Sequence, residues 1–236
     1  MIIMKKIYFT LIALLASINM LAQGWPANYS GVMLQGFSWD SYDYSQWTVL
    51  EKQADDMKGF IDLVWLPQSG KCIETTQVMG YKPYYYFNQN SSFGTEAELR
   101  SLIAKFKANG IGAIADVVVN HRNTDGWYTF PAETYKGVTY QMLPTDICKN
   151  DDGGSTAIQA KKDGVSLSNN YDEGTDFGGC RDIDHKSENV QKIIKAYLKF
   201  LKEDIGYTGF RYDMVKGFWG THVADYNDAT GVEFSV

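Results

Sequence analysis

The sequence lacks long runs of like charge, apolar runs of membrane-spanning length and an excess of basic residues. Its 22 basic and 28 acidic residues give a net charge of −6, which argues against nucleic acid as the partner and favours a neutral or cationic ligand. At 44% hydrophobic and 14% aromatic residues the composition is globular, so general disorder is excluded. Flat aromatic faces can stack on sugar rings, although most aromatic side chains in an enzyme belong to its core.

A short apolar run near the N-terminus predicts an export signal. The run Ile7–Ile18 follows Lys5 and Lys6, and a small residue, Ala22, comes shortly after it. The run is too short to cross a bilayer, which takes about 20 apolar residues. We therefore predict a signal peptide over residues 1–22 and a secreted, periplasmic or cell-surface protein with no stable membrane span. A retained membrane anchor is the alternative.

Three cysteines remain after that cleavage: Cys72, Cys148 and Cys180. An odd number is unusual for a protein in an oxidising compartment, where cysteines generally pair. If a bridge forms, Cys148 with Cys180 is the favoured pair.

Apolar segments with the periodicity of strands and of helices alternate along most of the chain. A β-α-β series of this kind favours parallel strands joined by right-handed crossovers, in either a barrel or an open doubly wound sheet. Thr95 and Ser187 are expected N-caps. The predicted strands cover residues 31–37, 61–66, 111–119 and 205–210, with a fifth opening at 232–236; the predicted helices cover 47–58, 95–109, 187–201 and 219–229.

Residues 122–184 interrupt this alternation. They are rich in Gly, Asn, Asp and Ser, as in Asn150–Ser155, and they contain only short apolar pieces with no helical period. An unstructured loop of this length is uncommon within a compact domain, so we predict an inserted subdomain.

Polar residues gather where the predicted strands end. Arg211 and Asp213 are two residues apart, so both side chains lie on one face of a strand, where the guanidinium can lower the pKa of the carboxyl group. This pairing is typical of an ionised nucleophile, and the alternative is an ordinary ion pair at the end of a strand. Asn120 and His121 end the third strand, and His121 can donate to a sugar hydroxyl or be a structural histidine. Asp116 lies within that strand, where bracing and catalytic roles are both open.

Several motifs, in matching order and spacing, resemble those of one family. Asp116–His121 and Gly209–Gly217 resemble the strand-three and strand-four motifs of the α-amylases of glycoside hydrolase family 13. Asp176–His185 is similar to the segment that closes their inserted domain B, especially in plant-type and secreted bacterial enzymes. Leu34–Trp39 and Trp65–Pro67 are of the same type, so the resemblance covers nearly all of the mature chain.

The resemblance implies an α/β fold, the (β/α)8 TIM barrel, of which the chain holds about the first four β/α units and the start of strand five. The implied boundaries are barrel strands one to three over 23–121, domain B over 122–184 and the barrel continuation over 185–236. In the family, a glutamate at the end of strand five is the general acid, and a later aspartate stabilises the transition state. Neither position lies within this sequence. We therefore expect a truncated, poorly stable chain that is inactive alone, since retaining cleavage needs an acid opposite the nucleophile.

The resemblance also implies roles for single residues. Asp213 would be the nucleophile in retaining hydrolysis of α-1,4-glucosidic bonds in starch or related α-glucans, and Arg211 would keep it ionised. His121 would bind the sugar at the cleavage subsite. Lys216 would contact the sugar on the leaving side, and Tyr81 would stack beneath the ring being cleaved. A full-length protein would act as a monomer.

A calcium site is implied in the same way. Ca²⁺ takes about six to eight hard oxygen ligands. The implied ligands here are the amide of Asn120, the carboxylates of Asp176 and Asp182, and the backbone carbonyl of Gly217. One ion would pin the insertion against the barrel beside the nucleophile. The alternative is that Asp176 and Asp182 only stabilise turns in an acidic loop.

Two other readings stay open. One is a non-catalytic α-glucan-binding remnant, in which aromatic side chains and His121 hold sugar without cleaving it. The other is a metal-dependent hydrolase that uses His121, Asp213 and His185; it is the weaker of the two, because strand one ends in Gln35–Phe37 without a pair of histidines for a catalytic metal. Calcium would support the α-amylase reading and zinc the hydrolase.

Overall fold

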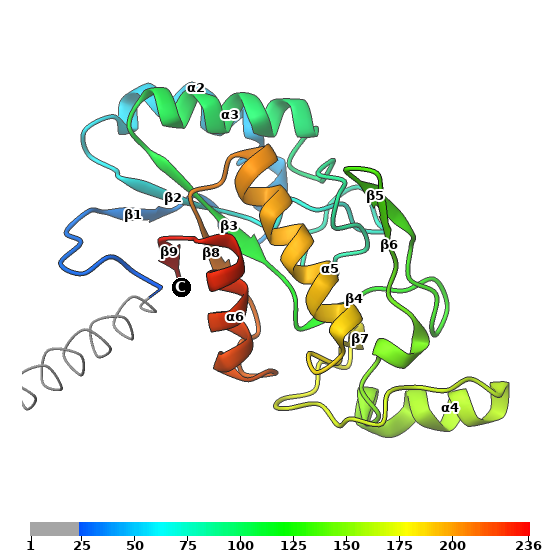
Figure 1. The fold of residues 1–236 in the computed structure, drawn as a ribbon. Coiled ribbons are helices and arrows are strands. Elements are labelled where there is room, and N and C mark those ends of the chain that lie inside the picture. The colour runs from blue at the N-terminus through cyan, green and yellow to red at the C-terminus, as the bar shows by residue number, and fades with distance from the viewer. Residues whose placement is uncertain (1–23) are drawn as a thin grey trace, which may run out of the picture.

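The computed structural model describes residues 24–236, so the predicted signal peptide lies outside the described residues. Its centre is a five-stranded parallel sheet whose strands follow one another in chain order (Figure 1). This order never reverses, which favours a barrel over a doubly wound sheet with its switch point. The strands are β1 (Met33–Gln35), β2 (Leu63–Leu66), β3 (Gly112–Val117), β8 (Gly209–Tyr212) and β9 (Phe234–Ser235).

Four helices connect these strands and cover one face of the sheet (Figure 1). They are α2 (Trp47–Met57), α3 (Glu96–Ala108), α5 (Glu188–Lys199) and α6 (Gly220–Thr230), with a short 3₁₀ helix η1 (Ser41–Asp43) before α2. The predicted caps are confirmed: Thr95 and Glu98 form a reciprocal capping box, and the Ser187 side chain accepts from the backbone N–H of Val190. Among residues 24–236, no helix has the length and apolarity needed to cross a membrane.

The two faces of the sheet carry different side chains because residues alternate along each strand. Val64 faces the helices and belongs to the main apolar core. Leu63 and Ile114 face the other way and belong to a second, smaller apolar cluster. Two residues farther along the same strands, this second face carries Trp65 and Asp116. The inner face is therefore apolar near the strand starts and polar near their C-terminal ends.

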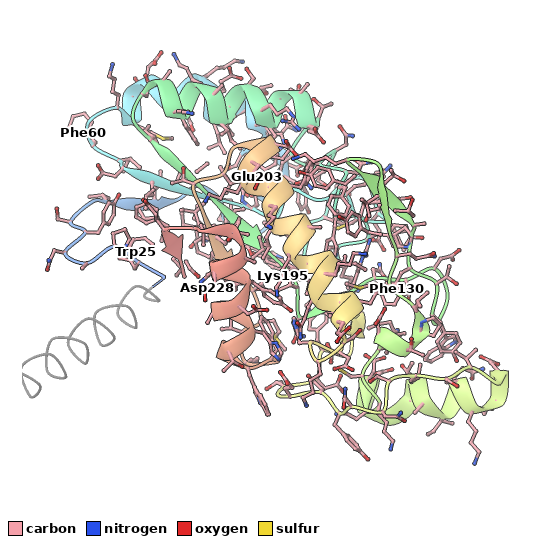
Figure 2. All side chains as sticks on the ribbon, viewed as in Figure 1. Trp25, Phe60, Phe130, Lys195, Glu203 and Asp228 are labelled. Carbon is pink, nitrogen blue, oxygen red and sulfur yellow. The ribbon has the colours of Figure 1, made fainter. Side chains whose placement is uncertain are left out.

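The second cluster is completed by the N-terminal segment. The Trp25 and Tyr29 rings each lie 5.0 Å from the ring of Phe234, and Trp25 lies beside β9 in Figure 2. Aromatic pairs at this spacing and near-perpendicular orientation are stabilising. The segment before β1 thus packs on the fifth strand of the sheet.

Residues between β3 and α5 form small elements of their own. They are β4 (His121–Arg122), β5 (Glu133–Tyr135), β6 (Val138–Tyr140), η2 (Pro144–Asp146), η3 (Asp151–Gly154), α4 (Ser155–Asp163) and β7 (Arg181–Asp182). Helix α4 lies in the stretch where the sequence shows no helical period. It buries only Thr156 and Ala160 and leaves Ile158 63% exposed, so it has no apolar stripe for the sequence to show.

The start of the fourth strand also needs correction. Ile205 was predicted to begin that strand, but α5 continues as a π-helix, η4 (Phe200–Ile205), and ends at Gly206 in the left-handed region with φ 104°. Ile205 is buried as part of this helix, and the strand begins only at Gly209. An apolar run alone does not separate a buried helix end from a buried strand.

Cys148 and Cys180, the favoured pair if a bridge forms, are not bridged in the structure. Both thiols are buried and free in the structure, as is that of Cys72. Burial raises the pKa of the Cys180 thiol to about 12 and that of Cys72 to about 11, so these side chains are protonated, unreactive thiols within the core.

Candidate active site

The site is built on two neighbouring parallel strands. The register of β3 and β8 places Asp116 directly opposite Arg211. Arg211 Nη1 lies 3.1 Å from Asp116 Oδ1 and 2.6 Å from Asp213 Oδ1. The predicted pairing of Arg211 with Asp213 on one face is confirmed, and the structure adds Asp116 as a second carboxylate on the same guanidinium. The Arg211 guanidinium also lies 4.9 Å from the Trp65 ring centre, where the aromatic face favours a cation.

Asp116 is held in a buried, fully bonded position. Its carboxylate accepts from Trp65 Nε1 at 3.2 Å and from the Tyr81 hydroxyl at 3.1 Å, in addition to Arg211. Burial raises the pKa of its carboxyl group to about 6, although Arg211 acts in the opposite direction. Because its side chain has no exposed surface, we assign Asp116 the bracing role and leave contact with a ligand to other groups.

Asp213 is more open. Its side chain is 21% exposed, and its backbone N–H donates to the Val117 carbonyl at 2.9 Å, one step beyond the strand ladder. Met214 follows with φ 55°, in the left-handed region that is unusual for a residue with a side chain, and its carbonyl accepts from Gly217 N–H at 2.9 Å. This tight turn ends the strand abruptly and leaves the Asp213 carboxylate at the mouth of the inner face.

An aromatic wall stands beside this carboxylate pair. The Tyr81 ring lies parallel to that of Trp39, with 6.1 Å between centres and 4° between planes, and both line a cavity of about 310 Å³. Trp39 is 71% exposed, so its face is available to a flat ligand. Burial and the nearby Asp116 raise the pKa of the Tyr81 hydroxyl, which stays protonated and able to donate. We did not single out Trp39 from the sequence, because its approach to Tyr81 depends on the fold.

His121 lies in a more enclosed place than expected. It is 1% exposed, and its ring stacks on Phe177 with 3.8 Å between centres. Its Nε2 lies 2.8 Å from the Tyr81 carbonyl and its Nδ1 lies 3.3 Å from Asn120 Nδ2. Burial lowers its pKa, so the ring is neutral. In this arrangement both ring nitrogens have protein partners and Phe177 covers the ring.

The expected site residues after Asp213 lie on the same turn. Lys216 is exposed, and its carbonyl accepts from Thr175 N–H at 3.0 Å, which fastens the insertion to this turn. Gly217 is buried against Asn120: a Cβ added at 217 would lie 1.9 Å from Asn120 Oδ1. Only glycine leaves room for Asn120 at this position, so the Asn120 amide lies beside the Gly217 backbone.

The expected metal ligands meet at one end of the insertion. Asn120 Nδ2 donates to Asp182 Oδ1 at 3.0 Å, and oxygen atoms of Asp151, Asp176 and Asp182 all lie within 4.8 Å of one another. Burial, and then the hydrogen bond to Asp176, raise the pKa of Asp182 to about 9. Three carboxyl groups this close to one another favour protonation of one of them, here Asp182. Their oxygen atoms form a set of ligands suited to a hard cation.

Asp151 is the member of this cluster that the sequence prediction missed. Its carboxylate accepts from Asp182 N–H at 2.7 Å and pairs with Arg181 Nη1 at 2.7 Å. Asp151 is one of two adjacent aspartates in an acidic, Gly-rich stretch, which is the signal that could have marked it. Arg181 thus neutralises part of the charge of the cluster.

The comparisons with known proteins agree with this geometry. The family model described as "Alpha amylase, catalytic domain" matches residues 60–233. Over 207 residues, 87% of this chain, the sequence is 32% identical to alpha-amylase 3, chloroplastic, and 30% identical to probable alpha-amylase 2, both of Arabidopsis thaliana. The chain spans 22% of the first relative and 46% of the second.

Solved structures show the fold. An alpha-amylase from Malbranchea cinnamomea superposes with a TM-score of 0.56 at 20% identity, covering 86% of this chain and 44% of that one. A mutant of alpha-amylase I from Eisenia fetida, in a complex with maltohexaose, gives 0.59 at 18% identity, covering 84% and 40%. The in-order parallel sheet is thus part of a TIM barrel. By its motifs, its fold and the family match over most of its length, the chain belongs to the alpha-amylase catalytic-domain family.

Proposed function

We propose that this chain takes part in retaining hydrolysis of α-1,4-glucosidic bonds in starch or related α-glucans, with Asp213 as the nucleophile. The observation that carries the proposal is the shared guanidinium. Arg211 bonds a buried carboxylate, Asp116, and a partly exposed one, Asp213, so its charge is fixed in place behind the exposed oxygen. A partly exposed carboxylate held by a fixed cation is suited to form a covalent glycosyl-enzyme intermediate.

Within this proposal the aromatic wall binds the sugar. Trp39 and Tyr81 offer parallel faces beside Asp213, and the Tyr81 hydroxyl is fixed by its hydrogen bond to Asp116. Lys216, exposed on the turn after Asp213, would contact the sugar on the leaving side. His121 would reach a sugar only if the Phe177 ring moved off it.

The acid that protonates the leaving oxygen is a separate question. Among residues 24–236, Asp116 is the carboxylate that shares Arg211 with Asp213, and its burial and full set of hydrogen bonds make it unsuitable for that step. We propose that Asp116 does not supply this proton and that the chain by itself hydrolyses starch poorly or not at all.

A glycosyl fluoride tests the nucleophile without the acid, because fluoride leaves without protonation. We expect a 2-deoxy-2-fluoro maltosyl fluoride to label Asp213: its carboxylate forms one ester bond to the anomeric carbon as the C–F bond there breaks and fluoride ion leaves. We expect no label on Asp213→Asn. Intact-mass and peptide mass spectrometry read the result. Lys161→Gln, on α4, is the matched control and should label like the wild type. A label on another residue, or an equal label on Asp213→Asn, would refute the assignment.

A second candidate function is α-glucan binding without cleavage. The observation that favours it is the exposed face of Trp39 parallel to Tyr81. Maltohexaose affinity that Trp39→Ala removes, together with no fluoride labelling, would support binding over catalysis.

We further propose a Ca²⁺ site formed by Asp151, Asp176 and Asp182, with the Asn120 amide and the Gly217 carbonyl beside them. The cluster of carboxylate oxygens within 4.8 Å supports it. When bound, the ion would supply positive charge that holds the insertion against the turn after β8. Export through residues 1–22, the domain boundaries stated above and a monomeric full-length protein remain part of the proposal.

A further inference from the structure

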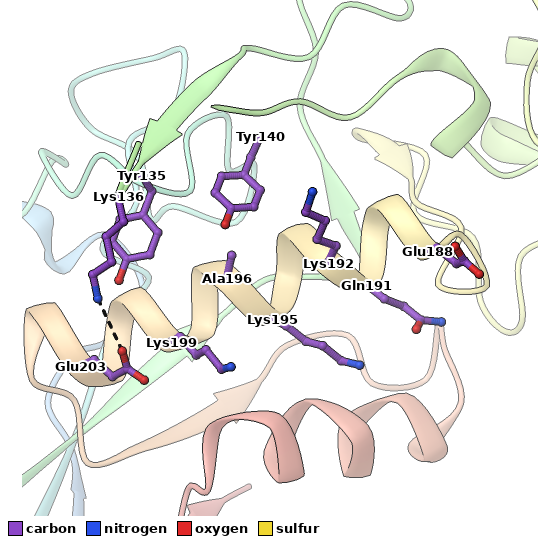
Figure 3. Close-up of a pocket in the computed structure, with 10 residues that line it drawn as sticks. All are labelled: Tyr135, Lys136, Tyr140, Glu188, Gln191, Lys192, Lys195, Ala196, Lys199 and Glu203. Carbon is purple, nitrogen blue, oxygen red and sulfur yellow. Dashed lines mark ion pairs between the residues drawn. The ribbon is translucent and has the colours of Figure 1, made fainter. Parts of the chain in front are cut away.

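A second concave site lies away from the carboxylate pair. It is a groove of about 510 Å³ between the β5–β6 hairpin and the outer face of α5, and it shares no lining residue with the cavity beside Trp39 (Figure 3). The volume is in the usual range for small-ligand sites, roughly 300–1,000 Å³. Its lining includes Tyr135, Tyr140, Ala196 and four lysines, together with two acidic residues, Glu188 and Glu203.

The walls of the groove are aromatic and well supported. Tyr135 stacks on Phe87 with 5.0 Å between ring centres, and Tyr140 lies 5.3 Å from the same ring. The Tyr135 hydroxyl bonds Asp204 on the π-helical end of α5. Ala196 lies on the floor opposite Tyr140, and its single methyl group leaves depth between the helix and the hairpin (Figure 3). The groove is therefore held open by packing on both sides.

Four lysines line this one groove in a chain whose net charge is −6. Two of them are neutralised: Lys136 lies 3.6 Å from Glu203, and Lys195 lies 2.5 Å from Asp225. Lys192 and Lys199 form no ion pair with any residue in the 24–236 range. They flank Ala196 on the same helix face, about 10 Å apart along the axis. Because neither ammonium group pairs with a carboxylate of the described residues, both can bond an anion that enters the groove.

Lys192 also ties the charge to the aromatic wall. Its Nζ lies 5.9 Å from the centre of the Tyr140 ring. A ring that stacked on Tyr140 would therefore present its substituents to this ammonium group. Gln191, also in the lining, donates from Nε2 to the His185 carbonyl at 2.8 Å, and its Oε1 can accept from a hydroxyl group.

We propose that this groove binds a sugar chain that carries a phosphate ester, with one sugar ring on Tyr140 and the phosphate between Lys192 and Lys199. The choice of an α-glucan as that chain rests on the proposed function; the choice of an anionic substituent rests on the two unpaired lysines. The groove would hold a phosphorylated glucan to the protein at a place separate from Asp213.

Calorimetric titration of the full chain at about 50 mM salt tests the proposal. The probes are maltohexaose with a phosphate ester on a C6 hydroxyl, unmodified maltohexaose and inorganic phosphate. We expect the phosphorylated probe to bind at least tenfold more tightly than either of the others. The double variant Lys192→Gln/Lys199→Gln should lose about tenfold in affinity for it, and Tyr140→Ala should lose a similar amount.

The matched control is Lys161→Gln/Lys162→Gln on α4, which removes the same charge elsewhere and should change nothing. Equal affinity for the phosphorylated and unmodified probes, or equal losses in the α4 control, would overturn the proposal, as would inorganic phosphate that binds as tightly as the sugar. If the glycosyl fluoride did not label Asp213 but the phosphorylated probe still bound the groove, the proposed function would be refuted and the proposed binding site would not.

Discussion

The buried ion pair between Arg122 and Glu133 predicts a large loss of stability when one partner is neutralised. Arg122 Nη2 lies 2.7 Å from Glu133 Oε2, with side-chain exposures of 1% and 7%. The Glu133 carboxylate also accepts from the backbone N–H groups of Tyr86 at 2.9 Å and Phe87 at 2.8 Å. Arg122 in turn donates to the Tyr84 carbonyl. One pair thus joins β4, the β5–β6 hairpin and the loop before α3.

Glu133→Gln keeps the shape of the side chain and removes its charge, so Arg122 stays buried without a counter-ion. Breaking a buried pair in this way costs about 3–5 kcal/mol, because the remaining charge is desolvated and unpaired. The Arg122 guanidinium lies 4.2 Å from the Tyr86 ring centre, and this cation–π contact offsets only part of the lost free energy of unfolding. We therefore expect the loss to lie near the lower end of the range, about 3 kcal/mol.

Urea unfolding followed by circular dichroism measures this loss as a lower midpoint at an unchanged m-value. The matched control is Glu96→Gln, which removes a half-exposed pair to Arg100 on α3 and should cost only about 0.5 kcal/mol. A loss below about 1 kcal/mol for Glu133→Gln would refute the reasoning, since such a value is typical of a solvated pair.

Three further predictions follow from the structure. Ca²⁺ at 100 times its Kd should stabilise the wild type by about 2.7 kcal/mol, which differential scanning fluorimetry detects as a higher melting temperature, and Mg²⁺ should not. An equal rise in melting temperature in Asp151→Asn would contradict the proposed calcium site. Burial, and then the neighbouring His222, lower the pKa of His185 to about 3, which is below the pKa of a histidine in the unfolded chain. The neutral His185 ring therefore contributes to stability above about pH 6.5, and this contribution is lost as the pH falls toward 3. Urea midpoints should fall over that range, and His185→Asn should flatten the fall; an unchanged pH profile in the variant would count against this assignment. Gly217→Ala should cost about 1–3 kcal/mol, because its Cβ would displace Asn120, whereas Gly220→Ala meets nothing within 4 Å and should be neutral; equal effects would show that the contact at 217 is not tight.

Local rules were enough to predict much of the sheet and part of the site. The two-residue spacing of Arg211 and Asp213 predicted a shared face, and the 2.6 Å contact confirms it. The apolar runs predicted the strands in their order, and Thr95 predicted the start of α3. These features depend on neighbours in the chain, so periodicity and capping chemistry reveal them.

The remaining features depend on contacts between distant segments. Asp151 bonds Asp182 across 31 positions, and the Tyr81 hydroxyl bonds Asp116 across 35. No spacing rule predicts either contact. The stacking of Phe177 on His121 is of the same kind, because it joins β4 to the far end of the insertion. Sequence reasoning therefore identified His121 as a polar strand end but could not show that its ring is covered.

The same long-range contacts explain how the insertion can act on Asp213 without touching it. The turn from Met214 to Gly217 links Asp213 to α6, and the insertion holds it from two sides. Thr175 N–H donates to the Lys216 carbonyl, and Asn120, bonded to Asp182, closes on Gly217. Because Met214 is in the left-handed region, this turn keeps its shape only while those contacts hold. Neutralising the Asp151–Asp176–Asp182 cluster, by a cation or by protonation, should therefore change how firmly the Asp213 carboxylate is held at the mouth of the sheet.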